Sequence, residues 1–116
     1  MASVDEVQRK LEELIERLHG SDDELKASLR DSLPEARILH LHVTDLEADF
    51  WTELVDGHMG ALHRGSPDEA HARIETDSDH FIDMVDGRLH LVSAFLSGKV
   101  RVDASFGDMM QLRKML

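Results

Sequence analysis

The strongest constraint on the fold is a change in the spacing of apolar residues at Arg37. Before this point, apolar residues recur every three or four positions, which is the period of one face of an α-helix. From Ile38 to Val43 the side chains alternate between two faces, which is the period of a β-strand. Helical spacing returns near Phe81 and again after Ser105. The sequence therefore predicts an α+β fold in which helices cover one face of a sheet.

The N-terminal part, residues 1–34, is predicted to be helical. Ser3 and Glu6 have the spacing of a capping box at the start of the first helix. A second, shorter helix over 21–33 carries leucines on one face and stops before Pro34. The apolar stripe of the first helix covers two heptads. It suits packing on the protein's own sheet or second helix, and it also allows a homodimer.

The remaining part, residues 35–116, is predicted to form the sheet and a cavity. Thr76 or Asp77 can cap a helix that ends at Gly87, whereas 88–95 fits a helix, a loop or an edge strand. Ser105 can cap a final amphipathic helix over 106–116. Alternation predicts a meander of four short antiparallel strands and then a last strand, at 37–43, 50–55, 59–63, 70–75 and 98–103.

Several of these pieces occur together in an order that resembles the sterol carrier protein 2 domain family. Trp51 lies in an early strand, and 77–87 is similar to the family's glycine-terminated helix. The run 94–102 pairs a small residue with an aromatic one, and leads through Gly-Lys into an alternating strand. The amphipathic segment 106–116 then closes the chain. The length of the chain suits one domain over 1–116. The resemblance covers 49–116, is compatible with the N-terminal helices, and implies a small, mostly antiparallel sheet covered by helices on one face.

The resemblance also implies a non-catalytic lipid carrier, with an apolar cavity between sheet and helices. Such cavities measure roughly 300–1,000 Å³. The expected ligand is a hydrophobic small molecule: a fatty acid, a fatty acyl-CoA, a sterol or an isoprenoid. The alternative is that the same side chains fill a closed core. The predicted lipid-binding residues are Trp51, Phe81, Val85, Leu91, Phe95, Phe106, Met109, Met110 and Leu112.

Two other functions stay open beside the lipid carrier. The first is an accessory domain whose apolar groove binds a protein partner. The second is a small metal-dependent enzyme, because the chain has eight histidines and His40 and His42 share a strand face. No HExxH motif, Gly-rich phosphate loop or G-x-S-x-G sequence is present, so we assign no catalytic residue, metal or cofactor.

Composition excludes further classes of function. The formal net charge of −11 argues against nucleic-acid binding, and the absence of cysteine excludes disulfides and thiolate zinc sites. The sequence has no long apolar run and no signal-peptide pattern, which predicts a cytoplasmic protein. Residues 99–116 carry four basic and two acidic side chains, a local charge of 4 − 2 = +2 that allows at most transient membrane contact.

Overall fold

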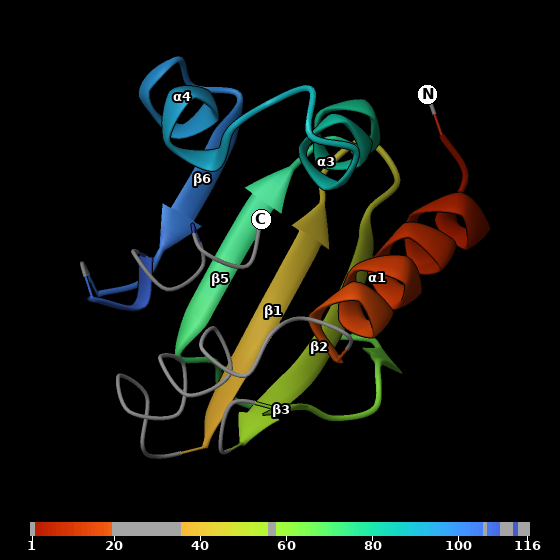
Figure 1. The fold of residues 1–116 in the computed structure, drawn as a ribbon, viewed down its shortest axis with the longest axis vertical. Helices are drawn as coiled ribbons and strands as arrows, with labels where there is room; N and C mark the ends of the chain where they lie inside the picture. Colours follow the sequence, from red (N-terminus) through yellow and green to blue (C-terminus); the bar gives the residue numbers. More distant parts are fainter. Residues whose placement is uncertain (1, 20–35, 56–57, 106, 110–112, 114–116) are drawn as a thin grey trace.

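Figure 1 shows the computed structural model, which describes residues 2–19, 36–55, 58–105, 107–109 and 113. The fold is α+β, as the change in apolar spacing predicted. The elements are α1 Val4–His19, β1 Arg37–Val43, β2 Ala48–Val55, β3 His58–Met59, β4 His63–Arg64, β5 Ala72–Thr76, α3 Ser78–Val85, α4 Leu91–Leu96 and β6 Val100–Asp103.

The strands form one mixed, mostly antiparallel sheet in the order β3-β2-β1-β5-β6, with β4 also paired to β2. β1 and β2 are antiparallel, and Leu41 lies opposite Phe50. β5 runs parallel to β1, with Leu39 opposite Ala72, and β6 returns antiparallel to β5. The expected meander of four antiparallel strands is therefore wrong at β5, which crosses to the far side of β1 instead of pairing with the preceding strand.

The segment 59–63 also differs from its prediction as a single strand. It contributes to two strands of two residues each, β3 and β4, which both pair with β2. Thr52 explains the interruption, because its hydroxyl donates to the carbonyl oxygens of Gly60 (3.2 Å) and Ala61 (3.1 Å). These carbonyls therefore bond a side chain where a continuous strand would bond its neighbour's backbone.

The helix ends that the sequence indicated are confirmed where the structure describes them. The Ser3 hydroxyl accepts a hydrogen bond from the Glu6 amide at 3.1 Å, and the Asp77 carboxylate caps α3 by accepting from the His80 amide at 2.8 Å. Gly87 adopts the left-handed conformation that ends a helix, with φ at 81°. The ambiguous stretch 88–95 contains most of α4. The predicted helix over 21–33 lies outside the described residues.

The side chains of the sheet divide into two faces with different chemistry. In Figure 1, α1 and α3 lie over the same side of the sheet, and their buried side chains join those of one sheet face in a single core. The alternate residues of each strand point to the opposite face of the sheet. This face carries polar groups, among them His40, His42, Asp49, Arg73 and Glu75. The core face carries Leu39, Leu41, Val43, Phe50, Thr52, Leu54, Ala72, Ile74, Thr76, Val100 and Val102.

Candidate functional site

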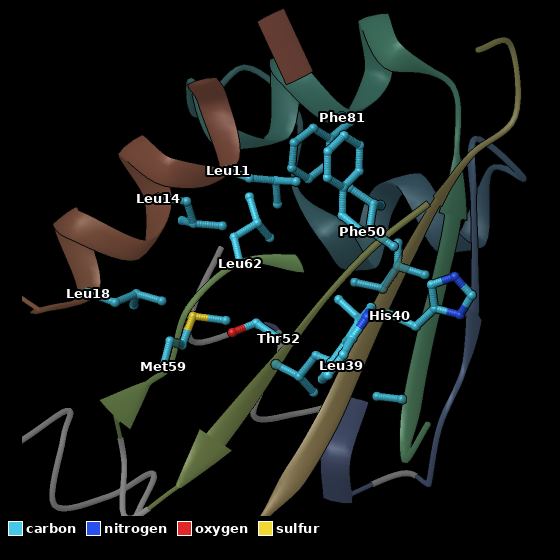
Figure 2. Close-up of a pocket in the computed structure, with 14 residues that line it drawn as sticks. Leu11, Leu14, Leu18, Leu39, His40, Phe50, Thr52, Met59, Leu62 and Phe81 are labelled. Carbon is cyan, nitrogen blue, oxygen red and sulfur yellow. The ribbon is translucent and has the colours of Figure 1, made fainter. Parts of the chain in front are cut away.

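An apolar cavity of about 70 Å³ lies between α1 and the core face of the sheet. Figure 2 shows the leucines of α1 along one side, Met59 and Leu62 beside them, and Phe81 of α3 near Phe50. The described residues that line the cavity are Leu11, Leu14, Leu18, Leu39, His40, Leu41, Phe50, Trp51, Thr52, Met59, Leu62, Ala72, Ile74 and Phe81.

The cavity lies between the apolar face of a helix and the apolar face of the sheet, and each face follows from the spacing of apolar residues in the sequence. Leu11, Leu14 and Leu18 follow each other at three- and four-residue steps, so they share one face of α1. Strand alternation and register place Leu41 beside Phe50 on the sheet face below them. The leucines were predicted to pack on the sheet, on the second helix or in a dimer, and were not predicted as site residues. Their apolar stripe was the signal that could have identified them.

Thr52 is the one polar side chain that the core face of β2 presents to the cavity. The residue is 5% exposed. Its hydroxyl donates to the Gly60 and Ala61 carbonyls, so it fastens the segment that carries Met59 and Leu62. A hydroxyl has a single hydrogen, and here that hydrogen is already engaged. Toward anything inside the cavity, Thr52 is therefore an acceptor.

A polar cluster lies on the opposite face, next to the cavity. The same oxygen of Asp49 is 2.7 Å from His40 Nε2 and 2.9 Å from His42 Nδ1. Burial raises the pKa of Asp49, but the hydrogen bonds from both imidazoles outweigh burial and leave that pKa below its ordinary value. An ionised carboxylate only accepts hydrogen bonds, so both imidazole nitrogens are donors here.

The histidines of this face are thus engaged with neighbours. Trp51 stacks on His63 with ring centroids 4.2 Å apart, and His71 Nδ1 accepts from the Ile38 amide at 3.0 Å. Within the described ranges, no group of three or more histidine, aspartate or glutamate side chains is arranged to hold a metal ion.

The residues predicted to bind lipid are distributed over the molecule. Trp51 and Phe81 line the cavity. Val85 and Leu91 are 2% and 3% exposed and belong to the closed part of the core, whereas Phe95 on α4 is 39% exposed. Met109 is half-buried, and the structure describes 107–109 as helical. Three further residues lie outside the described part of the chain: Phe106, Met110 and Leu112.

Polar contacts fasten α1 along the margins of the cavity. Lys10 Nζ is 2.8 Å from the Asp86 carboxylate, and this hydrogen bond lowers the pKa of Asp86 and raises that of Lys10. The Arg17 guanidinium donates to the Val85 carbonyl at 3.0 Å, which adds a second link to the end of α3. On the other side, Arg64 pairs with Asp5 at 3.0 Å. The Lys10 and Arg17 links are partly buried, and Val7, Leu14 and Leu18 of α1 are buried in the core.

Solved structures of several proteins share this fold. The UbiJ-SCP2 ubiquinone synthesis protein matches with a TM-score of 0.70 at 12% identity, over 90% of this chain and 88% of its own. Palmitated sterol carrier protein 2-like 2 from Aedes aegypti matches with a TM-score of 0.65 at 11% identity, over 97% of this chain and 93% of its own.

A third match is a segment of a larger enzyme. The sec-alkylsulfatase Pisa1 from Pseudomonas sp. has a TM-score of 0.62 at 17% identity. The match covers 78% of this chain but 14% of the sulfatase, so this chain corresponds to a small part of that protein. At these low sequence identities, the structural similarity establishes the fold alone.

The sequence itself identifies the family. No curated protein sequence matches the chain significantly. Among the described residues, no helix is both long and apolar enough to cross a membrane. The model of the SCP-2 sterol transfer family matches residues 8–116, which include every strand that the structure describes and three quarters of α1. The chain belongs to the SCP-2 sterol transfer family.

Proposed function

We propose that this chain is a non-catalytic carrier that binds the apolar body of a lipid between α1 and the sheet. The observation that carries the proposal is the cavity lining. Among its described residues there is no lysine, arginine, aspartate or glutamate, and eleven of the fourteen are aliphatic, methionine or phenylalanine. Such a surface attracts hydrocarbon and offers no paired acid and base for catalysis. Membership of a sterol transfer family supports the same function.

The cavity must widen to accept a lipid. Its volume of about 70 Å³ is well below the roughly 300–1,000 Å³ of ligand pockets. The side nearest Met59 and Leu62 is suited to movement, because β3 and β4 have two residues each and pair on one edge only. Met59 is also unbranched, so it can repack around an irregular ligand.

Energetics favour micromolar binding of a broad class of ligands. A sixteen-carbon chain gains at most about 12 kcal/mol from burial at roughly 0.8 kcal/mol per methylene. Association and ordering cost about 4–15 kcal/mol, so shape and length matter more than any single contact. The proposed ligands are a fatty acid, a fatty acyl-CoA, a sterol or an isoprenoid. The palmitated Aedes aegypti structure supports the acyl chain, and the family description supports the sterol.

Energy transfer from Trp51 to the fluorescent sterol dehydroergosterol tests the proposal. Trp51 is the sole tryptophan of the chain and borders the cavity, with its ring stacked on His63, so energy transfer reports a ligand bound close to β2. We expect saturable transfer with a Kd in the micromolar range. Leu62→Gln, which places an amide in the lining, should weaken binding at least about fivefold. The matched control Leu96→Gln, at a position 77% exposed on α4, should stay within about twofold.

The absence of saturable transfer, or equal effects of the two glutamine variants, would contradict a lipid carrier that uses this cavity. In that case the second candidate, an accessory domain that binds a protein, gains support. It rests on the exposure of Phe95 and Leu96 on α4, two large apolar side chains beside each other at the surface. Co-purification of a lipid with the intact protein, measured by mass spectrometry of organic extracts, would favour the carrier.

A further inference from the structure

We infer that the cavity selects lipids with an uncharged head group, with Thr52 as the acceptor for a lipid hydroxyl, and that it discriminates against ionised fatty acids. The inference rests on the proposed function and narrows it from four classes of ligand to the neutral ones. Long-chain alcohols, sterols and isoprenoid alcohols meet this description. A fatty acid at neutral pH does not.

The lining residues that the structure describes supply no counter-charge for a carboxylate. None of them is lysine or arginine. A carboxylate drawn into an apolar site without a partner loses its hydration, which disfavours binding of the ionised form. The polar cluster beneath the sheet adds to this effect, because ionised Asp49 is bonded to the lining residue His40.

The hydroxyl that the core face of β2 presents to the cavity fits a donor. The Thr52 hydroxyl donates its single hydrogen to the Gly60 and Ala61 carbonyls, and its oxygen can still accept a hydrogen bond. Figure 2 shows its oxygen on the side of Met59, within the ring of lining side chains. An alcohol can donate to this oxygen, whereas a carboxylate oxygen placed there would face another acceptor. An ester has no donor and would gain nothing from Thr52.

Two arginines on strands that pair with β2 are the cations to consider as partners for an anionic head group. Arg64 lies over the Phe50 ring, 6.0 Å from its centroid, but its guanidinium is engaged by Asp5 and Gln8. Arg37 lies at the start of β1, two residues before Leu39 on the same face. Its Nη1 is 3.8 Å from Asp108, and its buried Nε has no hydrogen-bond partner within the part of the chain that the structure describes. Arg37 is thus the cation that could receive an anionic head.

Displacement of dehydroergosterol by three ligands of equal chain length tests the inference. At pH 8, we expect 1-hexadecanol to displace the probe at a concentration about tenfold lower than palmitate, with methyl palmitate between them. Thr52→Val should weaken 1-hexadecanol about fivefold and methyl palmitate less than about twofold. Thr52→Ser, which keeps the hydroxyl, should restore the affinity for the alcohol.

The outcomes separate this inference from the proposed function. Failure of dehydroergosterol itself to bind would contradict the carrier. Binding of the probe together with palmitate displacement equal to or better than that of 1-hexadecanol would overturn the inference alone. Loss of that palmitate binding in Arg37→Gln would then identify Arg37 as an anchor for an anionic head. Equal weakening of alcohol and ester by Thr52→Val would also overturn the inference, because a structural role affects both ligands.

Discussion

Ser78 is a fully buried polar residue that joins three segments of the chain. Its amide and hydroxyl donate to the two oxygens of Asp45, at 2.9 and 2.6 Å, and its oxygen accepts from the Ala2 amide at 3.1 Å. Since Ser78 is 0% exposed, Ser78→Ala leaves Asp45 Oδ2 and the Ala2 amide without a replacement at the site, whereas the amide of residue 78 still donates to Asp45 Oδ1. We expect the free energy of unfolding to fall by about 1–2 kcal/mol. Urea denaturation measures the loss, and Ser66→Ala in an exposed turn is the control, with an expected change below about 0.5 kcal/mol.

The same contact has a defined pH dependence. Burial raises the pKa of Asp45, but the hydrogen bonds from Ser78 outweigh burial, and the pKa lies below its ordinary value of 3.8. A depressed pKa contributes stability above the pKa of the unfolded chain, and this stability is lost as pH falls through the folded value. The gap in unfolding free energy between the native protein and Ser78→Ala should therefore be full at about pH 6 and narrow below about pH 3.8. A gap that is unchanged at about pH 3 would contradict this assignment.

At the scale of elements, hydrophobic spacing identified where helices and strands lie better than which of them pair. The strand expected at 70–75 is observed at 72–76, yet it pairs in parallel with β1. Alternation is the same for a parallel and an antiparallel strand, so the pattern contained no information about the partner. The partner depends on the path of 61–71 and on the interrupted edge that Thr52 stabilises, which are long-range features.

The cavity likewise contains some residues that could be predicted from the sequence and others that could not. Trp51 and Phe81 could be predicted from their place in amphipathic elements, and both line the cavity. The contribution of α1 could not be predicted, because its stripe of leucines suits a core, a dimer or a cavity equally well. The position of α1 over the sheet depends on contacts between residues distant in sequence, such as Lys10 with Asp86 and Arg17 with Val85.

Within α1, stability and binding should be separable. Val7 is 0% exposed in the filled core, whereas Leu11, one turn later, is half-buried and lines the cavity. We expect Val7→Ala to lower the free energy of unfolding by about 2 kcal/mol and to leave the sterol Kd within about twofold. Leu11→Ala should cost about 1 kcal/mol or less and raise the sterol Kd about fivefold. Urea denaturation and dehydroergosterol titration of both variants measure the two effects. Equal stability losses would mean that Leu11 packs in a filled core.

At the scale of the whole molecule, a net charge of −11 opposes contact with anionic surfaces. Lys99, Arg101 and Arg113 are exposed, but exposed Asp103 is two residues from Arg101, so the basic region is partly neutralised. Repulsion acts over the Debye length of about 10 Å at 0.1 M salt and shortens as salt is added. A carrier of this charge should therefore exchange its ligand most readily with uncharged bilayers.

Transfer of dehydroergosterol from the protein to vesicles tests the predicted preference for uncharged bilayers. With about 0.02 M salt, we expect transfer to phosphatidylcholine vesicles to be at least about threefold faster than transfer to vesicles with about 30% phosphatidylserine. At about 0.5 M salt the difference should disappear, because screening removes repulsion but leaves the apolar binding intact. Lys99→Glu should lower both rates little. Faster transfer to the anionic vesicles, abolished by Lys99→Glu, would instead show that the local basic region docks the protein on the membrane and overrides its overall charge.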